Sequence, residues 1–536
     1  MKAAQAIIQC LKEENVTTVF GYPGAAVVPI YEVLKKSDIN HILVRQEQSA
    51  GHCASGYARS TGKVGVCIVT SGPGVTNLMT AIAAAYMDSI PLVIITGQVK
   101  TKLIGRDVFQ ELDATGATES FTKYNFLVKD SASIPKILKE AFYIAKTGRK
   151  GPVLVDVPVD IMEEDIDFKY PESVNIRGYK PTVEGHIGQI KRIVNRLKES
   201  KRPIICAGGG IILANATKEF RKFIEISKIP VVNTLMGKGS IDENSKYYVG
   251  MIGTHGFKYA NKAVENADVL ILMGARATDR TTCGLSNFAK KADVIHIDID
   301  PAEIGKNLTT DIPVVGDLKN IISKLIEMLP PINTENWLEI IHGYISQYKI
   351  TKKQTENINP KNVLDFISDK LDDDSIVTVD VGQNQIWCAR NYKIMGKRKF
   401  LTSGGLGTMG YSLSAAIGSK IGSPSKKVVA FVGDGGFQMS LFELGTISEY
   451  NINIIIVLFN NSGLGMVREL ENKRFSSEFG VTFKSNPDFV KLSEAYGIKA
   501  ERVTNGIEFN SAFSKALNSN EAFLIECVVD PKESTF

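Results

Sequence analysis

An aspartate and a pair of asparagines follow two consecutive apolar runs in the last third of the chain. Gly433-Asp434-Gly435 comes directly after the run 427–432, and Asn460-Asn461 comes directly after the run 454–459. Because parallel strands joined by a helix usually lie side by side, their C-terminal ends meet at one edge of a sheet, where ligands bind. We therefore expect Asp434 and Asn461 to lie close together.

The residue types at these positions suit a magnesium ion bound to phosphate. A carboxylate from Asp434, an amide oxygen from Asn461 and a backbone carbonyl such as that of Gly463 are hard oxygen donors of the kind that Mg²⁺ accepts. Glycines let the backbone approach a diphosphate at a helix N-terminus, where N–H groups favour anions. A plain strand-to-helix turn would also explain G-D-G, since glycine and aspartate are common turn residues.

The long spacing from G-D-G to N-N makes the pattern more specific. The segment reads GDGGFQMSLFELGTISEYNINIIIVLFNN. It resembles the signature of the thiamine diphosphate enzymes. This resemblance implies that the cofactor carries the electron-sink chemistry while the protein positions it.

Thiamine chemistry also needs a carboxyl group that hydrogen-bonds the pyrimidine ring of the cofactor. Glu47 follows the apolar run 41–44 and precedes a helix rich in small residues, so we expect it where strand ends open into a cleft. A first-turn glutamate stabilised by the helix dipole would look the same. From the pattern alone, that ordinary explanation is favoured.

The elements that would position these residues occur twice. In the first block we expect a strand at 63–70, a turn at 71–74, a helix at 77–86 and a strand at 91–96. The third block repeats this with a strand at 427–432, a turn at 433–436, a helix at 438–450 and a strand at 454–459. Small-residue helices, 50–59 and 412–420, precede both copies. Two copies of one architecture would suit a ligand held between them, although coincidence among α/β units is the alternative.

Short β-branched runs alternate with longer amphipathic stretches along the whole chain, which predicts an α/β class with parallel sheets covered by helices. Polar, proline-bearing stretches at 163–182 and 330–360 interrupt this rhythm, and the second contains a helical segment of its own. We therefore expect three doubly wound domains: a pyrimidine-binding domain at 1–165, a central FAD- or nucleotide-type domain at 185–330 and a diphosphate-binding domain at 355–536.

Composition excludes several classes of protein. The 536 residues are 44% hydrophobic and 23% charged, values typical of a globular protein and not of a disordered or coiled-coil chain. The net charge of +5 is spread along the chain, so we expect neither nucleic acid nor an anionic membrane as a partner. The seven cysteines form no C-x-x-C pair, which argues against a disulfide framework and a zinc site. Without an apolar leader at the N-terminus, the expected location is the cytoplasm.

The similarity to one family covers nearly the whole chain. VFGYPGAAVVPIYEVL, RQEQSAG, SGPGVTNL, IPLVIITGQV, FQE and GPVLVDVP resemble the acetolactate synthase large (catalytic) subunits block for block. The resemblance implies that Glu47 is the activating glutamate, with Gly24 and Ala25 near the reacting centre. It also implies that Phe109 and Gln110 line a substrate channel of the neighbouring subunit. The expected contacts to thiamine diphosphate are Gly382, Gln383, Asn384, Gly407, Met409, Gly433, Asp434, Gly435, Gly436, Asn461, Gly463, Leu464, Gly465 and Met466, with Asp434, Asn461 and Gly463 holding Mg²⁺.

The middle block contains two candidate dinucleotide features, a strand at 204–210 that ends in glycines and a strand at 294–300 that ends in acids. Neither completes G-x-G-x-x-G, so the residues alone leave a nucleotide site open. NTLMGKGS, GMIGTHG, GARATDR and HIDIDPAEIGKN resemble the flavin domain of acetolactate synthases, which implies a structural FAD. The implied FAD contacts are Arg149, Gly209, Thr234, Leu235, Met236, His255, Gly274, Arg276, Asp279, Arg280, Asp298, Ile299, Glu303 and Asp317.

Several positions depart from the family pattern. Gln46 replaces a histidine and Ala25 a glycine, Val159 stands where most members carry lysine, and Leu470 stands where a tryptophan usually shapes the pocket for the second 2-oxo acid. The sequence also stops at Phe536 without the usual proline- and glycine-rich tail. These changes put the acceptor preference in doubt and leave the cofactor chemistry in place.

The expected reaction is decarboxylation of pyruvate and transfer of the two-carbon unit to a second 2-oxo acid, which gives 2-acetolactate or 2-aceto-2-hydroxybutyrate in branched-chain amino acid biosynthesis. The expected assembly is a homodimer or homotetramer, with a small regulatory subunit as a further candidate partner. The alternatives are a pyruvate oxidase, a glyoxylate carboligase or a sulfoacetaldehyde acetyltransferase, and, from another class, a non-catalytic subunit. The presence of Glu47, Asp434 and Asn461 together argues against the last of these.

Overall fold

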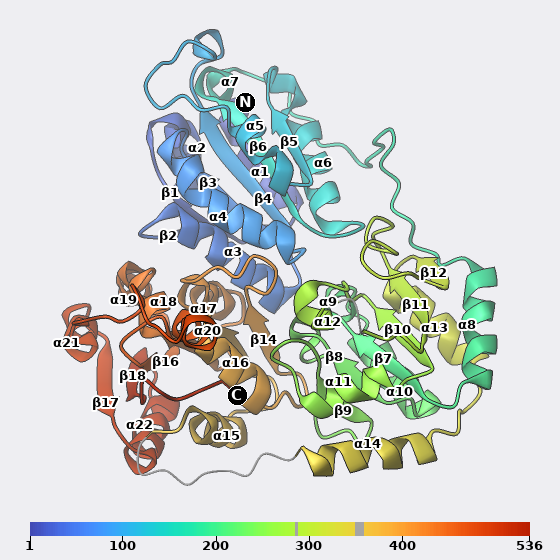
Figure 1. Ribbon diagram of the computed structural model, residues 1–536. Helices are drawn as coiled ribbons and strands as arrows, with labels where there is room; N and C mark the ends of the chain where they lie inside the picture. The colour runs from blue at the N-terminus through green and yellow to red at the C-terminus, as the bar shows by residue number, and fades with distance from the viewer. Residues whose placement is uncertain (285–287, 349–357, 536) are drawn as a thin grey trace. The chain divides into compact units, whose positions relative to one another are not determined.

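The fold consists of three parallel sheets of six strands each, interleaved with helices (Figure 1). The computed structural model describes residues 1–284, 288–348 and 358–535. The expected start of the third domain at residue 355 and the last residue of the chain lie outside the described residues. The three sheets confirm the predicted α/β class.

The first sheet has the strand order β2-β1-β3-β4-β6-β5. Helices cover both faces, so the central strands β3, β4 and β6 are buried along their whole length, while the edge strands β2 and β5 are partly exposed. In β3, Val66 and Ile68 pack in one hydrophobic cluster, while Cys67 and Val69 pack in the cluster on the opposite face. The strands are β1 (Thr18–Tyr22), β2 (Asn40–Leu43), β3 (Gly65–Val69), β4 (Leu92–Gln98), β5 (Tyr124–Leu127) and β6 (Pro152–Pro158), and the helices are α1 (Ala3–Glu13), η1 (Ala25–Val27), α2 (Val28–Leu34), α3 (Glu47–Thr61), α4 (Pro73–Met87), η2 (Thr101–Leu103), α5 (Ala114–Thr118), η3 (Glu119–Phe121), η4 (Ser131–Ser133), α6 (Ile134–Lys146) and α7 (Val159–Glu163).

The third sheet has the order β14-β13-β15-β16-β18-β17, which repeats the order of the first sheet strand for strand. This shared strand order agrees with the predicted internal repeat. The elements are α15 (Pro360–Lys370), β13 (Ile376–Val379), α16 (Gln383–Asn391), β14 (Lys399–Thr402), α17 (Tyr411–Gly422), β15 (Val428–Gly433), α18 (Asp434–Gln438), η6 (Leu441–Glu443), α19 (Leu444–Glu449), β16 (Ile455–Asn460), α20 (Gly465–Phe475), α21 (Phe489–Ala495), β17 (Lys499–Val503), α22 (Gly506–Asn518) and β18 (Phe523–Val528).

The middle sheet has a different order, β12-β11-β10-β7-β8-β9. The chain reverses direction across this sheet between β7 and β10, which is the order of the dinucleotide-binding doubly wound fold. Its elements are α8 (Ile187–Glu199), β7 (Pro203–Ala207), α9 (Gly209–Leu213), α10 (Thr217–Ser227), β8 (Val231–Asn233), η5 (Leu235–Gly237), β9 (Tyr248–Met251), α11 (Lys258–Glu265), β10 (Val269–Met273), α12 (Asp279–Thr282), β11 (Asp293–Asp298), β12 (Ile312–Val315), α13 (Leu318–Met328) and α14 (Glu335–Gln347).

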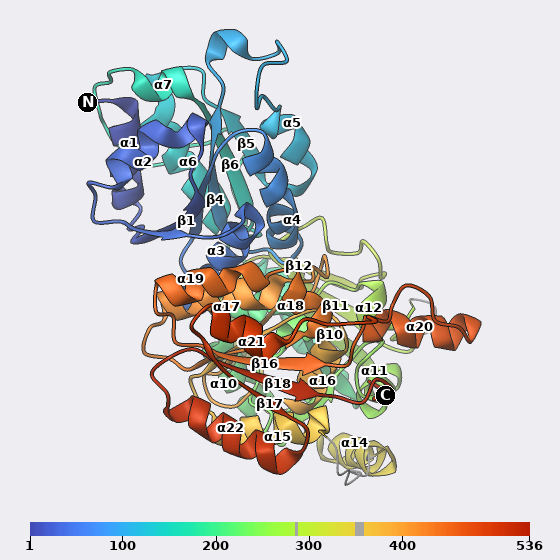
Figure 2. The same cartoon turned by 90° about the vertical axis from the view of Figure 1, so that its left-hand side faces the viewer.

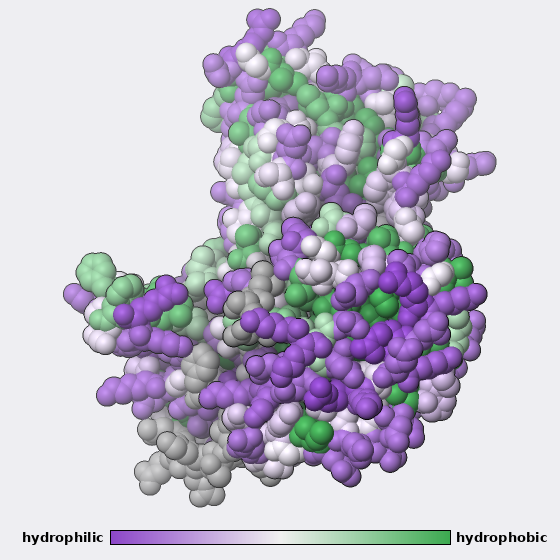
Figure 3. Space-filling model, turned by 45° about the vertical axis from the view of Figure 1, so that its right-hand side comes forward, coloured by the Kyte–Doolittle hydropathy of each residue, from purple (hydrophilic) through white to green (hydrophobic). Residues whose placement is uncertain are grey.

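The chain forms two compact units. The first comprises Met1–Lys180, Ile376–Gln385 and Leu401–Lys532, and the second comprises Pro181–Ser375, Ile386–Phe400 and Glu533–Phe536. The first and third sheets therefore share one unit, and one hydrophobic cluster runs through both. Hydrophilic side chains dominate the face drawn in Figure 3, with hydrophobic residues in small groups. Across the described ranges, every helix is too short or too polar to cross a membrane.

Helices α3 and α17 pack closely within the first unit, and each contributes a glycine to the contact. A Cβ added to Gly56 would lie 2.1 Å from the carbonyl oxygen of Ala415, and one added to Gly418 would lie 1.8 Å from that of Cys53. The contact is therefore reciprocal. The predicted small-residue helices are confirmed, and their composition allows their backbones to approach.

Three predicted local structures were wrong in detail. The helix expected at 77–86 begins earlier, because Pro73 starts α4 as its first residue, where a missing N–H costs nothing. The turn expected at 433–436 is the start of helix α18, and the helix expected at 438–450 is broken into α18, η6 and α19. The break falls at Ser440, whose φ of −140° lies outside the helical range.

Candidate functional site

Asp434 and Gly463 meet at the C-terminal edge of the third sheet, as the sequence predicts. Strands β15 and β16 pair in parallel with Gly433 opposite Phe459, so the residues that follow both strands emerge together. The amide of Gly463 donates to Oδ2 of Asp434 at 3.1 Å, and Asp434 is buried. Burial raises the pKa of Asp434, while hydrogen bonds from Asn486 and from the amides of Gly435 and Gly463 oppose this rise.

Asn461 lies in the same cluster and is oriented by Gln383. Its Nδ2 donates to Oε1 of Gln383 at 2.6 Å, and Nε2 of Gln383 donates to Glu469 at 2.5 Å. An amide that donates through its nitrogen keeps its oxygen available as a ligand atom. A Cβ on Gly465 would lie 1.8 Å from Oε1 of Gln383, so a larger residue here would displace the Gln383 amide from its present position.

The other predicted contacts to the diphosphate gather at this edge. A Cβ on Gly435 would lie 2.8 Å from Cδ2 of Leu464 and 3.4 Å from Cε of Met409. Added Cβ atoms on Gly382 and Gly433 would both lie within 3.5 Å of Oδ1 of Asn384. Two further predicted residues lie on the adjoining segments, Gly407 with φ +74° and Met466 in the first turn of α20.

Asp380 holds the segment that carries Met409, a role that no sequence pattern indicates. The carboxylate accepts hydrogen bonds from the amides of Gly410 at 3.0 Å and Ser412 at 2.9 Å. Burial raises the pKa of Asp380 to about 6, against the effect of these amides. A Cβ on Gly436 would lie 2.6 Å from its Oδ1, so Asp380 ties β13 to both glycine-rich segments.

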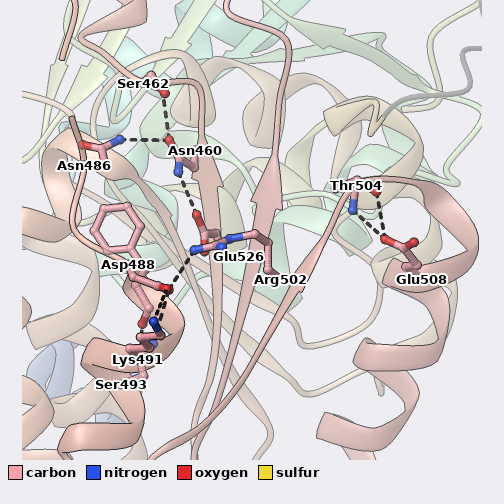
Figure 4. A network of polar contacts seen from close by, with 11 residues as sticks. Asn460, Ser462, Asn486, Asp488, Lys491, Ser493, Arg502, Thr504, Glu508 and Glu526 are labelled. Carbon is pink, nitrogen blue, oxygen red and sulfur yellow. Dashed lines mark hydrogen bonds and ion pairs between the residues drawn. The ribbon is translucent and has the colours of Figure 1, made fainter. Parts of the chain in front are cut away.

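Asn486 is a second residue that the sequence did not reveal. Its Nδ2 donates to Oδ2 of Asp434 at 2.9 Å. The same nitrogen lies 3.1 Å from Oδ1 of Asn460 (Figure 4). Nδ2 of Asn460 in turn donates to Oε1 of Glu526 at 2.8 Å. Asn460 therefore contacts Asn486, which binds the carboxylate of Asp434, while Asn461 binds Gln383.

Arg502 continues this network along the edge strands (Figure 4). Its Nε donates to Glu526 and its Nη2 to Asp488, both at 2.8 Å. The hydrogen bond to Glu526 raises the pKa of Arg502. Asp488 also caps α21 by accepting from the amide of Lys491, so the network anchors the irregular segment that presents Asn486.

Glu47 lies at the corresponding edge of the first sheet as the first residue of α3. It is buried, and its Oε2 accepts a hydrogen bond from Nδ2 of Asn77 on α4 at 2.9 Å. A Cβ on Gly74 would lie 2.8 Å from Thr70 and 3.7 Å from Oε1 of Glu47, and one on Gly24 would lie 2.5 Å from Thr70. The predicted residues Gly24 and Glu47 are thus joined through Thr70 and Gly74, and Ala25 is exposed beside them.

The predicted channel residues lie on the connection that follows β4. The backbone of Gln110, whose φ is +59°, lies within 3.2 Å of a Cβ added to Gly72. The side chain of Phe109 is 87% exposed. Oε2 of Glu111 accepts hydrogen bonds from the amides of Arg106 and Val108, so hydrogen bonds within the connection stabilise its conformation.

Hydrogen bonds that involve two aspartates hold the two ends of this connection in place. Asp160 accepts from the amide and hydroxyl of Thr101, the latter at 2.6 Å. At the other end, Nε2 of Gln98 donates to the carbonyl of Leu112 at 2.7 Å and to Oδ2 of Asp156 at 2.9 Å. Burial raises the pKa of Asp156 to about 7, against the effect of its hydrogen bonds from Thr96 and Gln98.

In the second unit, the predicted FAD contacts follow the C-terminal ends of successive strands. Gly209 follows β7, Thr234 follows β8 and Gly274 follows β10. A Cβ on Gly208 would lie 2.0 Å from the carbonyl of Gly274, at the point where the strand order reverses and doubly wound sheets bind dinucleotides. Asp298 ends β11 and Asp317 caps α13.

The remaining predicted FAD contacts are spread over several elements. Met236 lies against Gly209, whose added Cβ would be 3.2 Å from the methionine Cβ. Arg149 belongs to the first unit, where its Nε donates to Ser89. Asp279 and Arg280 have largely exposed side chains. The others are Leu235 in η5, His255 after β9, Arg276 after β10, Ile299 after β11 and Glu303, which pairs with Lys306.

The donor chemistry at both edges fits the groups that the sequence implies. Among residues 1–284, 288–348 and 358–535, no three histidine, cysteine or acidic side chains cluster as metal ligands. The predicted carboxylate, amide and carbonyl oxygens are donors of the type that Mg²⁺ accepts. In the second unit, Oδ1 of Asn233, buried at the end of β8, lacks a hydrogen-bond partner in the structure, as a polar atom beside a bound group would.

The structure also shows on which elements the positions that depart from the family pattern lie. Gln46 precedes the first residue of α3, and Val159 is the first residue of α7. Leu470 is 43% exposed on α20, the helix that extends away from its sheet in Figure 2. Helix α20 buries only Gly465 and Arg468, so its apolar residues have little contact within the chain.

Comparison with known proteins identifies the family. Models of the N-terminal TPP binding domain, the central domain and the C-terminal TPP binding domain of thiamine pyrophosphate enzymes match residues 1–117, 190–325 and 380–527. A Methanocaldococcus jannaschii protein named "Probable acetolactate synthase large subunit" is 47% identical over 550 residues, covering 100% of this chain and 93% of the relative. The Escherichia coli acetolactate synthase isozyme 3 large subunit is 41% identical over 551 residues, covering 100% and 96%. The chain therefore belongs to the acetolactate synthase large-subunit family of thiamine pyrophosphate enzymes.

Proposed function

We propose that this protein catalyses the thiamine diphosphate-dependent decarboxylation of pyruvate and the transfer of the two-carbon unit to a second 2-oxo acid, giving 2-acetolactate. The observation that carries the proposal is the placement of a buried glutamate and a magnesium-type donor set at equivalent edges of two identically ordered sheets. Similarity to acetolactate synthase large subunits over the full chain supports it.

Each edge has a distinct task in this reaction. Thiamine diphosphate, when bound, supplies a carbanion that adds to the 2-oxo carbon, and its ring then accepts the electron pair that stays behind when carbon dioxide leaves. Asp434, Asn461 and the carbonyl of Gly463 would hold Mg²⁺ against the diphosphate. Met409 would support the bent form of the cofactor, and Glu47 would hold a proton at the pyrimidine nitrogen.

We infer that one cofactor spans two copies of the chain, with Glu47 from one copy and Asp434 from the other. The exposed Phe109 and the apolar residues of α20 support this arrangement, because both would gain contacts from a second copy.

The same proposal includes a homodimer or homotetramer and a structural FAD in the middle domain. It also includes the domain boundaries 1–165, 185–330 and 355–536. A small regulatory subunit is consistent with relatives named large subunits. A cytoplasmic location is supported by seven free cysteines.

Glu47→Gln tests the proposal. The substituted side chain would keep the hydrogen bond from Asn77 through its amide oxygen, so folding and cofactor binding should change little. Turnover should fall about 10²- to 10⁴-fold, because a positioned proton-transfer group contributes that much. The assay measures acetolactate from pyruvate with and without 2-oxobutyrate, and calorimetry measures cofactor binding. Glu14→Gln, which removes another buried carboxylate from the first unit, is the matched control.

Near-normal turnover of Glu47→Gln would show that Glu47 is not the activating residue. Flavin reduction by pyruvate in the presence of an electron acceptor, without acetolactate, would instead assign the chain to the oxidases. Full activity of a verified monomer would contradict the shared cofactor site.

A further inference from the structure

Glu443 is a buried carboxylate that the proposed reaction does not use. It lies at the end of η6, within the segment that links Asp434 to Asn461, and its side chain is inaccessible to solvent. Burial raises the pKa of Glu443, and hydrogen bonds from Thr446, the Arg45 amide and Ser49 oppose this rise. A carboxylate is costly to bury unless it is hydrogen-bonded, so its partners indicate what it does.

Those partners lie on both sides of Glu47. Oε1 of Glu443 accepts a hydrogen bond from the amide of Arg45 at 2.9 Å, two residues before Glu47. Ser49, two residues after Glu47, also acts on the Glu443 carboxylate and lowers its pKa. Thr446 donates to Oε2 of Glu443 at 2.6 Å and so fixes the orientation of the carboxylate.

The surrounding segment strengthens this link. The amide of Leu43, at the end of β2, donates to the hydroxyl of Tyr450 at 3.0 Å. Nη2 of Arg45 binds Oε2 of Glu449 at 2.6 Å. A Cβ on Gly445 would lie 2.9 Å from Nε of Arg45, so this glycine makes room for the guanidinium. Residues 443–450 therefore hold the connection between β2 and α3 at several points, all within one compact unit.

From this geometry we infer that Glu443 is a positioning residue for Glu47. It fixes the main chain before Glu47 and the first turn of α3 after it, and so sets where the Glu47 carboxylate points. The inference rests on the proposed function, because it assigns Glu443 a role in presenting the activating glutamate. It also means that the segment between the metal-binding residues of a chain orients the glutamate of that same chain.

The test uses three substitutions at one position in the full-length protein. Glu443→Gln keeps the length of the side chain and an oxygen that can accept from Arg45. Glu443→Asp keeps the charge but is one methylene shorter, and Glu443→Ala removes the group. Glu14→Ala is the control, since Glu14 is a buried carboxylate of the same unit that binds Lys139, Lys146 and Tyr170.

The first readout is amide hydrogen exchange in the cofactor-free protein, measured by mass spectrometry. Peptides that cover residues 43–49 should exchange faster in Glu443→Ala and Glu443→Asp than in the wild type. They should exchange at the wild-type rate in Glu14→Ala and close to it in Glu443→Gln. Unchanged exchange of 43–49 in Glu443→Ala would overturn the inference, whether or not the protein is an acetolactate synthase.

The second readout is the rate at which the thiazolium proton of bound thiamine diphosphate exchanges with deuterium, followed by NMR after acid quenching. Misplacement of a catalytic group by about 1 Å costs up to about 100-fold, so Glu443→Ala and Glu443→Asp should slow this exchange about 10- to 100-fold. Their affinity for thiamine diphosphate and Mg²⁺ should stay within about threefold of the wild type, which is less than about 1 kcal/mol.

The outcomes separate the two claims. If Glu443→Gln loses as much exchange as Glu443→Ala, the charge and not the reach of the side chain matters, and the positioning role is overturned. If the wild type itself does not accelerate exchange of the thiazolium proton, the proposed function fails, while hydrogen exchange at 43–49 still decides the role of Glu443.

Discussion

Asp156 should make the first sheet less stable as the pH rises, and Asp156→Asn should remove this dependence. Asp156 lies on β6, buried, and accepts hydrogen bonds from Thr96 at 2.6 Å and Gln98 at 2.9 Å. Burial raises its pKa from 3.8 to about 7. Between these two pH values the folded protein keeps the proton while the unfolded chain has lost it, so the free energy of unfolding falls with rising pH.

The size of the effect follows from the width of this interval. From 3.8 to about 7, at about 1.4 kcal/mol per pH unit, the loss amounts to about 4 kcal/mol once the pH exceeds the folded-state pKa. An asparagine side chain at this position would keep both neighbours, since its oxygen can accept from Gln98 and its nitrogen can donate to the hydroxyl of Thr96. It carries no charge, so it avoids the loss.

Amide hydrogen exchange of β4 and β6 measures this locally, which suits a multidomain chain that need not unfold in one step. At each pH the wild type is compared with Asp156→Asn, so that the intrinsic pH dependence of exchange cancels. From about pH 4.5 to about pH 8 the ratio of their exchange rates should shift toward slower exchange in the variant by up to about 300-fold. A ratio that stays constant over this range would refute the reasoning.

Three further outcomes are expected. Asp434→Ala should weaken Mg²⁺-dependent binding of thiamine diphosphate at least about tenfold by calorimetry, because hard cations depend on carboxylate oxygens; undiminished binding would contradict the metal assignment. Glu111→Gln should leave the fold intact but speed proteolysis between Lys100 and Glu111, where the carboxylate holds backbone amides; an unchanged cleavage rate would show that the other contacts suffice. The wild type should favour 2-oxobutyrate over pyruvate as acceptor only weakly, and Leu470→Trp should raise the product ratio, since a methylene in a fitted apolar pocket is worth about 1 to 3 kcal/mol. Strong selectivity in the wild type would assign it to another residue.

The sequence predicts the parts of the site that depend on strand ends. Asp434 and Gly463 come together because they follow two strands that pair in parallel, and an apolar run followed by glycine shows where each strand ends. The repeat was also visible, since both copies keep the same succession of small-residue helix, strand, turn, helix and strand. Similarity to the family then assigned cofactor contacts that residue patterns alone leave open.

Contacts made by irregular segments could not be predicted in this way. Asn486 reaches Asp434 from a segment without periodicity, and its position depends on Arg502 and Asp488, which are far from Asp434 in sequence. Glu443 was hidden within a helix that was expected to be continuous. The backbone of Ser440 interrupts that helix, and local propensity does not predict such a break.

The reciprocal contact between α3 and α17 has a consequence for paired substitutions. A methyl group on either Gly56 or Gly418 would strike a carbonyl on the opposite helix, and either one alone would force the same two backbones apart. Once the first substitution has separated them, the second meets less resistance, so the energetic penalties of Gly56→Ala and Gly418→Ala should not add. A double-mutant cycle would then give a large coupling energy between these two glycines. Since α3 carries Glu47 at its first residue, this shared spacing also sets how far a mutation in α17 can displace the Glu47 side chain.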